Sequence, residues 1–424
     1  MHPLTKLIRE DMKPALGVTE PGAIAFAVAK ARKYLQGEVR KIHLRLNSGM
    51  LKNAYTCGIP GCSRVGSLYA AALGGLAADP QKGLECLEGI TEEDDRNAQK
   101  LVEAGRVSTE LTQISSRIFI EARVEAESGW AQVTIEDAHT HITRIVVNGD
   151  IVFSGERKAQ TEEEQAPIHQ YTAAQLLEYV KTVPAPELEF IEEAYRMNFA
   201  LFEEGLQSPK TTFVDFLLEK NQGEIFSEDP LNTAALLCAG AIEARVIGLD
   251  RPAMSITGSG AHGIIATMPL YALYKTLALS RESLLRATAL SFLICMYIKE
   301  YSGRLSAFCG CAIAAGTGAA CGIVSLKNGG QEEMAAAIRN MASSITGMIC
   351  DGGNQGCTMK GMTAVYAAFA AAELAMNKVS VDAVHGINGA SPEDTMRYMG
   401  QIASPGMVET EKTILDIFQE KMKK

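Results

Sequence analysis

The chain has 424 residues, of which 47% are apolar and 21% charged, enough material for two or three domains with sizeable cores. Its 40 basic and 50 acidic residues give a net charge of −10. With no basic surplus to neutralise phosphates, we expect neither a nucleic-acid nor a membrane partner. The N-terminal stretch is charged from residue 6 onward and lacks the apolar core of a secretory signal, so we expect a cytoplasmic protein.

Two helices and then a sheet domain are expected in the first 165 residues. The helices lie within residues 1–36, and we predict that they pack on the helical domain later in the chain. In residues 37–165, four stretches alternate apolar and polar residues as half-buried strands do. With helical segments between the first strand and the others, they predict an α+β fold class whose first domain is an antiparallel-sheet α/β sandwich. The expected strands are 39–46, 117–125, 131–136 and 141–147.

The rest of the chain predicts helices. Residues 156–167 are charged and patternless, which indicates a linker or an exposed loop. Residues 166–424 are rich in helix formers and predict a larger, all-helical domain. Within it, Leu305–Leu326 contains no charge over 22 residues, long enough to span a bilayer. Because this run is mostly Ala, Gly, Ser, Thr and Cys, which gain little from lipid, we predict a buried helix.

The chain contains ten cysteines, which we read as core thiols, cluster or metal ligands, or a nucleophile rather than a disulfide framework. The segment GMICDGGNQGC (347–357) places Cys350 and Cys357 around a Gly-rich stretch that must interrupt a helix and expose backbone N–H groups. Thiolates beside free N–H donors suit an iron–sulfur cluster, and the loop also suits a carboxylate. The alternative is a glycine loop between helices that end in core cysteines.

A second cysteine segment is RLSAFCGC (304–311). Arg304 stands just before the long uncharged run that carries Cys309. Cys311 is two residues further on, so on a helix it points elsewhere, and only one of the two thiols is expected to face a given site. The alternative is a core cysteine in a helix of small residues.

Four further features are candidates for catalysis or binding. The loop SITGSGAHG (255–263) enters a helix whose N-terminus would hold a carboxylate or phosphate, and His262 could act as acid or base; a plain helix start is the alternative. Glu20 either caps a helix or points into a site. Lys52 is a possible substrate-binding cation. The pair His139 and His141 either shares one strand face and binds a metal or lies in an exposed loop.

Together these segments resemble the L-cysteine desulfidase family, which is related to the α-chain of iron–sulfur L-serine dehydratases. The resemblance covers nearly the whole chain. It rests on KPALGVTEP (13–21), KN (52–53), PG (60–61), HT (139–140), GSGAHG (258–263), ATMP (266–269), RLSAFC (304–309), GMICDG (347–352), Cys357 and MK (359–360).

The resemblance implies a lyase with a [4Fe–4S] cluster, no pyridoxal phosphate and a small amino-acid substrate. L-cysteine would give pyruvate, ammonia and sulfide; the alternatives are L-serine dehydration and a cluster-free relative that binds a small molecule. A homodimer is expected as the commonest assembly. The implied metal ligands are Cys309, Cys350 and Cys357. The implied catalytic residues are His262, Lys52 and Glu20. The implied substrate-binding residues are Thr19, Asn53, Ser259, Gly260, His139, Thr140 and Arg304.

One departure from the family pattern concerns Val18, which stands where the motif usually has cysteine. Valine offers neither a donor atom nor a titratable proton. Three outcomes are open: the three remaining thiolates suffice, another residue such as Cys62 or His262 substitutes, or this member has lost the desulfidase reaction.

Overall fold

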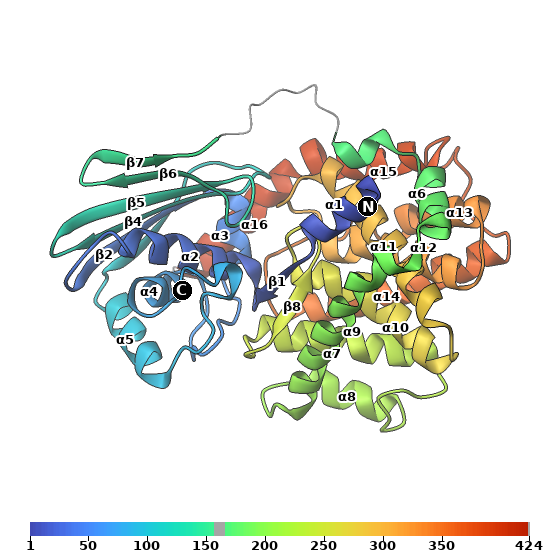
Figure 1. The fold of residues 1–424 in the computed structure, drawn as a ribbon, viewed down its shortest axis with the longest axis horizontal. Coiled ribbons are helices and arrows are strands. Elements are labelled where there is room, and N and C mark those ends of the chain that lie inside the picture. Colours follow the sequence, from blue (N-terminus) through green and yellow to red (C-terminus); the bar gives the residue numbers. More distant parts are fainter. Residues whose placement is uncertain (157–165, 423–424) are drawn as a thin grey trace.

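The α+β fold class is confirmed by the computed structural model, which describes residues 1–156 and 166–422. A sheet covered by helices stands on one side and a larger helical body on the other (Figure 1). Each has its own apolar core. Most of the expected linker, residues 157–165, lies outside the described residues.

The sheet has six strands in the order β3-β2-β4-β5-β6-β7. The pairs are antiparallel except that β3 runs parallel to β2, which corrects the expectation of a purely antiparallel sheet. A helix between β2 and β3 allows the chain to return in the same direction, as a parallel pair requires. The strands are β2 (Val39–Leu46), β3 (Val107–Leu111), β4 (Phe119–Ala126), β5 (Gly129–Glu136), β6 (Ile142–Val147) and β7 (Asp150–Ser154).

One face of the sheet is covered by α2 (Thr19–Arg32) and α4 (Ser67–Leu76), with α5 (Glu92–Glu103) packed on α4. Strand β4 alternates buried and half-buried residues along its whole length, as expected when one face is covered. The two N-terminal helices separate. Helix α1 (Pro3–Asp11) packs on the helical body, whereas α2 packs on the sheet, contrary to the expectation for residues 1–36. Nearly every residue of α2 is buried, so it can contact the sheet and the second body at once.

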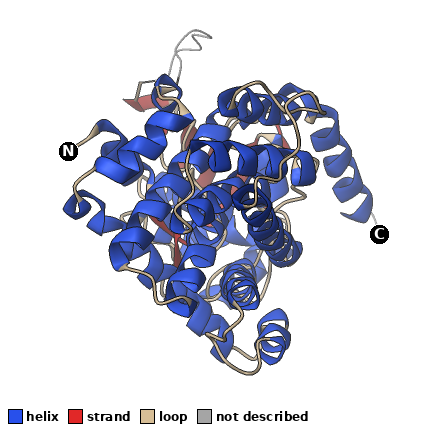
Figure 2. Ribbon diagram, turned by 90° about the vertical axis from the view of Figure 1, so that its right-hand side faces the viewer, coloured by secondary structure: helices blue, strands red, loops and turns tan. Residues whose placement is uncertain are grey.

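The helical body is built around five helices that are rich in small residues, and Figure 2 shows it almost entirely as helix. These are α9 (Pro230–Val246), α10 (Gly260–Thr276), α11 (Arg281–Ser302), α12 (Gly316–Leu326) and α14 (Gly356–Met376). Around them lie α6 (Ala173–Thr182), α7 (Glu192–Gln207), α8 (Phe213–Lys220), α13 (Gln331–Ile345) and α15 (Pro392–Gln401). Short helical turns are η1 (Gly83–Glu85), η2 (Pro167–Gln170), η3 (Ala185–Ile191), η4 (Cys311–Ala315) and η5 (Ile402–Gly406).

Two connections hold the sheet side and the helical body together. Strand β1 (Lys13–Leu16) pairs antiparallel with β8 (Pro252–Ser255), so the second domain is not wholly helical as expected. The C-terminal helix α16 (Val408–Met422) returns to pack on α3 (Ser48–Asn53), which follows β2. These connections bring residues from both ends of the chain to the junction of the two bodies.

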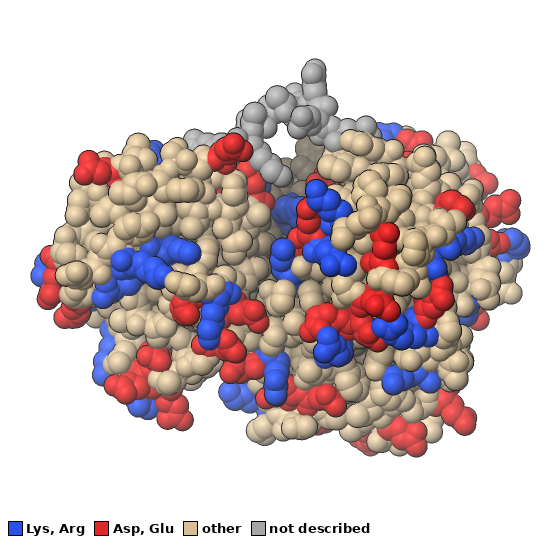
Figure 3. All heavy atoms as spheres, viewed as in Figure 1, with Lys and Arg blue, Asp and Glu red and all other residues tan. Residues whose placement is uncertain are grey.

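The charged side chains of the described residues do not gather into a large patch of one sign on the face drawn in Figure 3. Acidic and basic side chains are interspersed over the face seen in Figure 3. None of the helices in the described residues is long and apolar enough to cross a membrane. Part of the uncharged run Leu305–Leu326 forms η4 and α12, which are buried within the helical body.

Candidate functional site

The two cysteine segments are joined through their backbones. The Cys309 N–H donates to the Met348 carbonyl at 3.0 Å, and the Cys350 N–H donates to the Ala307 carbonyl at 2.6 Å. These bonds make a short antiparallel bridge between Phe308 and Ile349. The bridge places Cys309 and Cys350 on neighbouring extended segments, although 40 residues lie between them in sequence.

The third thiol is brought in by the Gly-rich loop. Cys357 lies in the first turn of α14, and its N–H donates to the Asn354 carbonyl at 2.9 Å. The loop before it passes close to the end of α3: a Cβ on Gly352, whose φ is +101°, would lie 2.4 Å from the Lys52 carbonyl oxygen. The sequence therefore needs glycine here for close approach and for backbone conformation.

All three thiols line one pocket at the junction of the two bodies, with a cavity volume of about 70 Å³. Cys311 lines it too, which corrects the expectation that only one thiol of the 304–311 segment faces the site. Most of the predicted site residues line it too, and they come from elements far apart in the sequence. These are Glu20, Asn53, His139, Ser259, His262, Arg304, Cys309, Cys350 and Cys357.

The pocket's thiols differ in their ease of ionisation. Cys309 Sγ lies 3.4 Å from Cys311 Sγ, and this hydrogen bond lowers the pKa of Cys309 and raises that of Cys311. The charges of Lys360 and Lys52 also favour the Cys309 thiolate. Burial raises the pKa of Cys350, and it raises the pKa of Cys357 to about 12. A metal that binds these thiols must therefore displace their protons.

Glu20 is the one carboxylate in the described lining of this pocket. Burial alone would raise its pKa, but His139, Asn53 and Arg245 outweigh burial and lower it to about 2. Asn53 Nδ2 donates to Glu20 Oε1 at 2.9 Å, and His139 Nε2 lies 3.8 Å from the same oxygen, beyond hydrogen-bond range. Glu20 is therefore ionised at neutral pH despite being only 6% exposed.

His262 is held as a neutral imidazole. Burial lowers its pKa well below the usual value, and the nearby charges of Lys299 and Arg245 add to the effect. The Thr257 hydroxyl donates to the Ile256 carbonyl at 2.7 Å, so its oxygen is left to accept from His262 Nδ1–H. This arrangement assigns the proton to Nδ1 and leaves Nε2 as a free acceptor.

Lys299 lies next to His262. A Cβ on Gly310 would lie 2.8 Å from His262 Nε2 and 3.0 Å from Lys299 Nζ, so both nitrogens face the backbone beside Cys309. Burial lowers the pKa of Lys299 to about 8. The pocket thus holds two nitrogen bases that are neutral or partly neutral near physiological pH.

Four predicted residues lie outside the pocket lining. The Thr19 hydroxyl accepts from Arg245 Nη2 at 3.2 Å, and Gly260 packs beneath the same guanidinium, so both lie one layer behind the pocket. Lys52 is fully buried, donating to Glu411 Oε2 at 2.7 Å and to the Ser306 carbonyl at 2.8 Å. Its ammonium positions the Cys309 segment and does not reach the pocket. Thr140 is exposed and stands apart, so its assignment to substrate binding is not supported.

Sequence reasoning missed two cations of the pocket, Arg245 and Lys299. Each stands near the C-terminal end of a helix, after a mostly apolar stretch, and each has an acidic residue one or two positions away in sequence. Buried Arg and Lys side chains are rare unless they are paired. The sequence pattern is that of an ordinary charged helix end, so it does not distinguish these two cations from surface residues.

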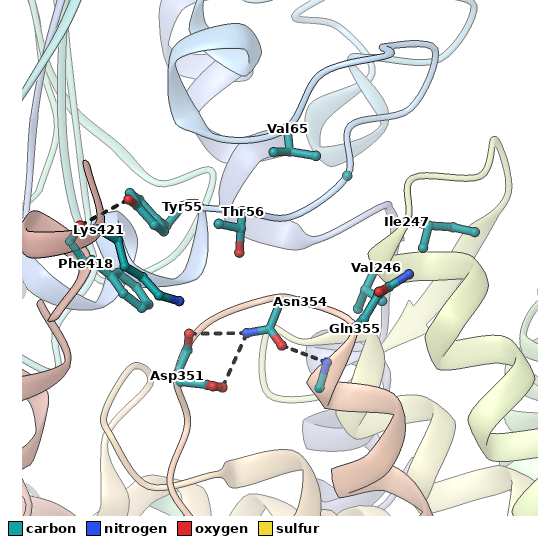
Figure 4. A pocket seen from close by; sticks show the side chains of 12 residues that line it. Tyr55, Thr56, Val65, Val246, Ile247, Asp351, Asn354, Gln355, Phe418 and Lys421 are labelled. Carbon is teal, nitrogen blue, oxygen red and sulfur yellow. Dashed lines mark hydrogen bonds between the residues drawn. The ribbon is translucent and has the colours of Figure 1, made fainter. Parts of the chain in front are cut away.

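A second, larger cavity of about 570 Å³ lies on the other side of the 351–356 loop (Figure 4). Tyr55 stacks on Phe418 with ring centroids 4.4 Å apart, and its hydroxyl donates to the Phe418 carbonyl. Asn354 Nδ2 donates to the Asp351 side chain and carbonyl. We call the thiol-lined space the inner pocket and this one the outer cavity; the loop forms the wall between them.

Comparisons with known proteins identify the family of the chain. The model of the family described as serine dehydratase alpha chain matches residues 81–416, well over half of the chain. The chain belongs to this family. The relationship to the α-chain of L-serine dehydratase expected from the motifs is thereby confirmed.

Individual proteins also match along nearly the whole chain. A UPF0597 protein of Clostridium botulinum strain Okra is 40% identical over 430 residues, covering 99% of each protein. A UPF0597 protein of Clostridioides difficile strain 630 is 34% identical over 421 residues, covering 98% of this chain and 99% of the relative. These names state a family and no reaction.

The family implies an iron–sulfur cluster, and the donor set of the inner pocket fits one. In the described residues no three His, Cys, Asp or Glu side chains converge on a point that could hold a single metal ion. A cubane makes a weaker demand, because each thiolate binds a different iron. Three thiols, nearby lysines and backbone N–H groups suit it chemically. The small cavity means that these side chains must move apart to admit it.

Proposed function

We propose that this protein is an iron–sulfur-dependent lyase that removes the β-substituent of a small L-amino acid, giving pyruvate and ammonia. The observation that carries the proposal is the meeting of three thiols, a neutral histidine and an ionised carboxylate in one buried pocket. The serine dehydratase alpha chain family supports the same reaction class.

In this proposal Cys309, Cys350 and Cys357 hold the cluster, which when bound supplies an open iron as a Lewis acid for the departing group. The chain's own residues do the rest. His262 Nε2 accepts the α-proton, since Nδ1 is fixed on Thr257. Lys52 positions the Cys309 segment through the Ser306 carbonyl. Burial excludes water from the reacting atoms.

L-serine and L-cysteine are the two candidate substrates. The sequence motifs favour L-cysteine, with sulfide as the second product. The family match favours L-serine, and so does Val18, which lines the pocket as the N-cap of α2 and cannot replace the cysteine of the desulfidase motif. A Cβ on the facing Gly353 would lie 2.8 Å from Val18 Cγ1, so valine already fills the space there.

Anaerobic purification tests the proposal directly. The protein should be brown, with about four iron and about four sulfide per chain for one cubane. It should form pyruvate from L-serine or L-cysteine, and sulfide release distinguishes the two substrates. Colourless, iron-free anaerobic protein that forms no pyruvate would overturn the lyase assignment and leave a protein that binds a small molecule without catalysis.

A further inference from the structure

The buried Arg245 of α9 has hydrogen-bonding capacity to spare. Its side chain is 4% exposed, and among the described residues its Nε has no hydrogen-bond partner. Nη2 donates to Thr19 Oγ1 at 3.2 Å. A guanidinium keeps its charge in proteins, and leaving a buried donor unpaired is costly. A buried cation with an unpaired N–H that lines a pocket calls for an anionic ligand.

The N-terminus of α10 lies against this guanidinium. A Cβ on Gly260, the first residue of α10, would lie 2.6 Å from Arg245 Nε, so only glycine allows the two to approach. Ser259 at the N-cap makes no side-chain cap, which leaves the first N–H groups of a 17-residue helix available. The N-terminus of α10 and Arg245 together form a site suited to a carboxylate. A guanidinium group can bind a carboxylate through two parallel hydrogen bonds.

Glu20 provides the opposite charge in the same pocket. The charges of Arg245 and Glu20 act on each other, and Arg245 is held by Thr19, the residue next to Glu20. The described lining contains this one carboxylate against three cations, Arg245, Lys299 and Arg304. An anionic and a cationic group that share one small buried cavity match the two charged ends of an α-amino acid.

We propose that Arg245 and Glu20 form a zwitterion clamp, in which Arg245 with the N-terminus of α10 binds the substrate carboxylate and Glu20 binds the substrate ammonium group. The clamp rests on the proposed function, since it names the substrate class of the same pocket: small α-amino acids with both groups free. The clamp fixes the α-carbon of the substrate between Arg245 and Glu20. The direction of the β-substituent is then set by the other residues that line the pocket.

One-ended analogues of L-serine test the clamp. 3-Hydroxypropionate keeps the carboxylate and ethanolamine keeps the ammonium group, and anaerobic calorimetry gives the affinity of each. Arg245→Gln should weaken 3-hydroxypropionate about tenfold or more, the effect of losing a charge-assisted hydrogen bond, and leave ethanolamine within about twofold. Glu20→Gln should do the reverse. This crossed pattern is not expected from a general disturbance of the pocket, which would weaken both analogues.

The control is Arg251→Gln, which removes an exposed arginine whose ion pair with Glu204 lies on the surface, and it should change neither affinity. Equal weakening of both analogues, or none, in Arg245→Gln overturns the clamp. Should that variant fail to fold, Arg245→Lys keeps the positive charge but loses the paired N–H donors of the guanidinium. It should weaken the binding of 3-hydroxypropionate and leave that of ethanolamine unchanged. Wild-type protein that binds L-serine no better than either analogue also overturns it.

The measurement separates the clamp from the lyase assignment. Wild-type protein without iron or pyruvate formation, but with the crossed pattern, would refute the lyase and keep the clamp. Active, iron-loaded wild-type protein whose Arg245→Gln variant binds both analogues normally would refute the clamp and keep the lyase.

Discussion

The inner pocket and the outer cavity share one wall, the 351–356 loop, yet they differ in chemistry. The outer cavity is the larger, about 570 Å³ against about 70 Å³. Its central polar groups already bond to one another: Asp351 with Asn354, and the Tyr55 hydroxyl with the Phe418 carbonyl (Figure 4). The inner pocket instead gathers thiols, uncapped helix ends and the unpaired atoms Arg245 Nε and His139 Nε2.

This difference is why we propose the inner pocket as the functional site: its buried polar atoms lack partners among the described residues, whereas the outer cavity is only larger. A folded chain normally pairs its buried polar atoms, so a place where several are left over is one where a ligand completes the pairing. The inner pocket also keeps buried charges that oppose folding, whereas the outer cavity keeps an aromatic stack that favours it. Three substitutions can break or sharpen the contrast.

The largest effect is expected from Cys350→Ser. Removing one of three thiolates should abolish cluster absorbance and reduce bound iron to background in anaerobic protein, because a serine hydroxyl is a poor ligand for iron in such clusters. The matched control is Cys62→Ser, because Cys62 is not among the residues that line the inner pocket and a serine hydroxyl can keep the hydrogen bond that the thiol donates to Asp95. Full absorbance in Cys350→Ser would remove Cys350 from the ligand set and weaken the distinction between the two cavities.

Sequence reasoning reached the thiols, the loops and Arg304 of this pocket but not its other two cations, Arg245 and Lys299. The motifs around Cys309, Cys350 and Glu20 are local, so a family resemblance identifies them without knowing where they meet. The significance of Arg245 and Lys299 depends on burial in a tertiary structure that one helix cannot reveal. The buried ion pair of Lys52 was missed for the same reason, since its partner Glu411 lies near the other end of the chain.

The fold was predictable to a similar degree. The alternation of apolar and polar residues predicted β2, β4, β5 and β6, because each of these strands buries one face. That pattern is visible in the sequence of the strand alone. The strands β1, β3, β7 and β8 were missed. They have four or five residues each. The pairing of β1, β3 and β8 is set by partners distant in sequence, and β7 is exposed along its whole length, so it shows no alternation. We predicted that helix α2 packs on the helical body, but it packs on the sheet. Its sequence is apolar on all sides, in keeping with its nearly complete burial, so no single apolar face indicates which neighbour it contacts.

A smaller effect is expected from Lys299→Met, which should increase the stability of the fold. Burial lowers the pKa of Lys299 to about 8, so at pH 7 the fold carries a buried ammonium, at a cost of about 3 kcal/mol relative to the unfolded chain. Iron-free Lys299→Met protein should therefore be more stable than wild type by up to about 3 kcal/mol at pH 7, as measured by urea unfolding.

The pH dependence of the stability difference between wild type and Lys299→Met shows whether the charge of Lys299 causes it. Below the folded pKa both states are protonated and the full penalty applies. Between pH 8 and about 10.5 the unfolded chain binds more protons, so wild-type stability gains on that of Lys299→Met as pH rises. The advantage of the variant should be gone above about pH 10.5. An advantage that stays constant from pH 7 to pH 10 would mean that the side chain's packing, and not its charge, is responsible.

The smallest effect is expected in the outer cavity, from Phe418→Leu. This change removes the stack with Tyr55 and should cost about 1 kcal/mol of unfolding free energy. Bound iron and the affinity for L-serine should stay within about twofold of wild type, because no group of the inner pocket is altered. Tyr55→Phe is the matched variant: it keeps the stack and loses only the bond to the Phe418 carbonyl. Since the loop between the cavities carries Cys350 and Cys357 at its ends, a large loss of iron in Phe418→Leu would show that the outer cavity holds this wall in place. The two spaces would then act as one site.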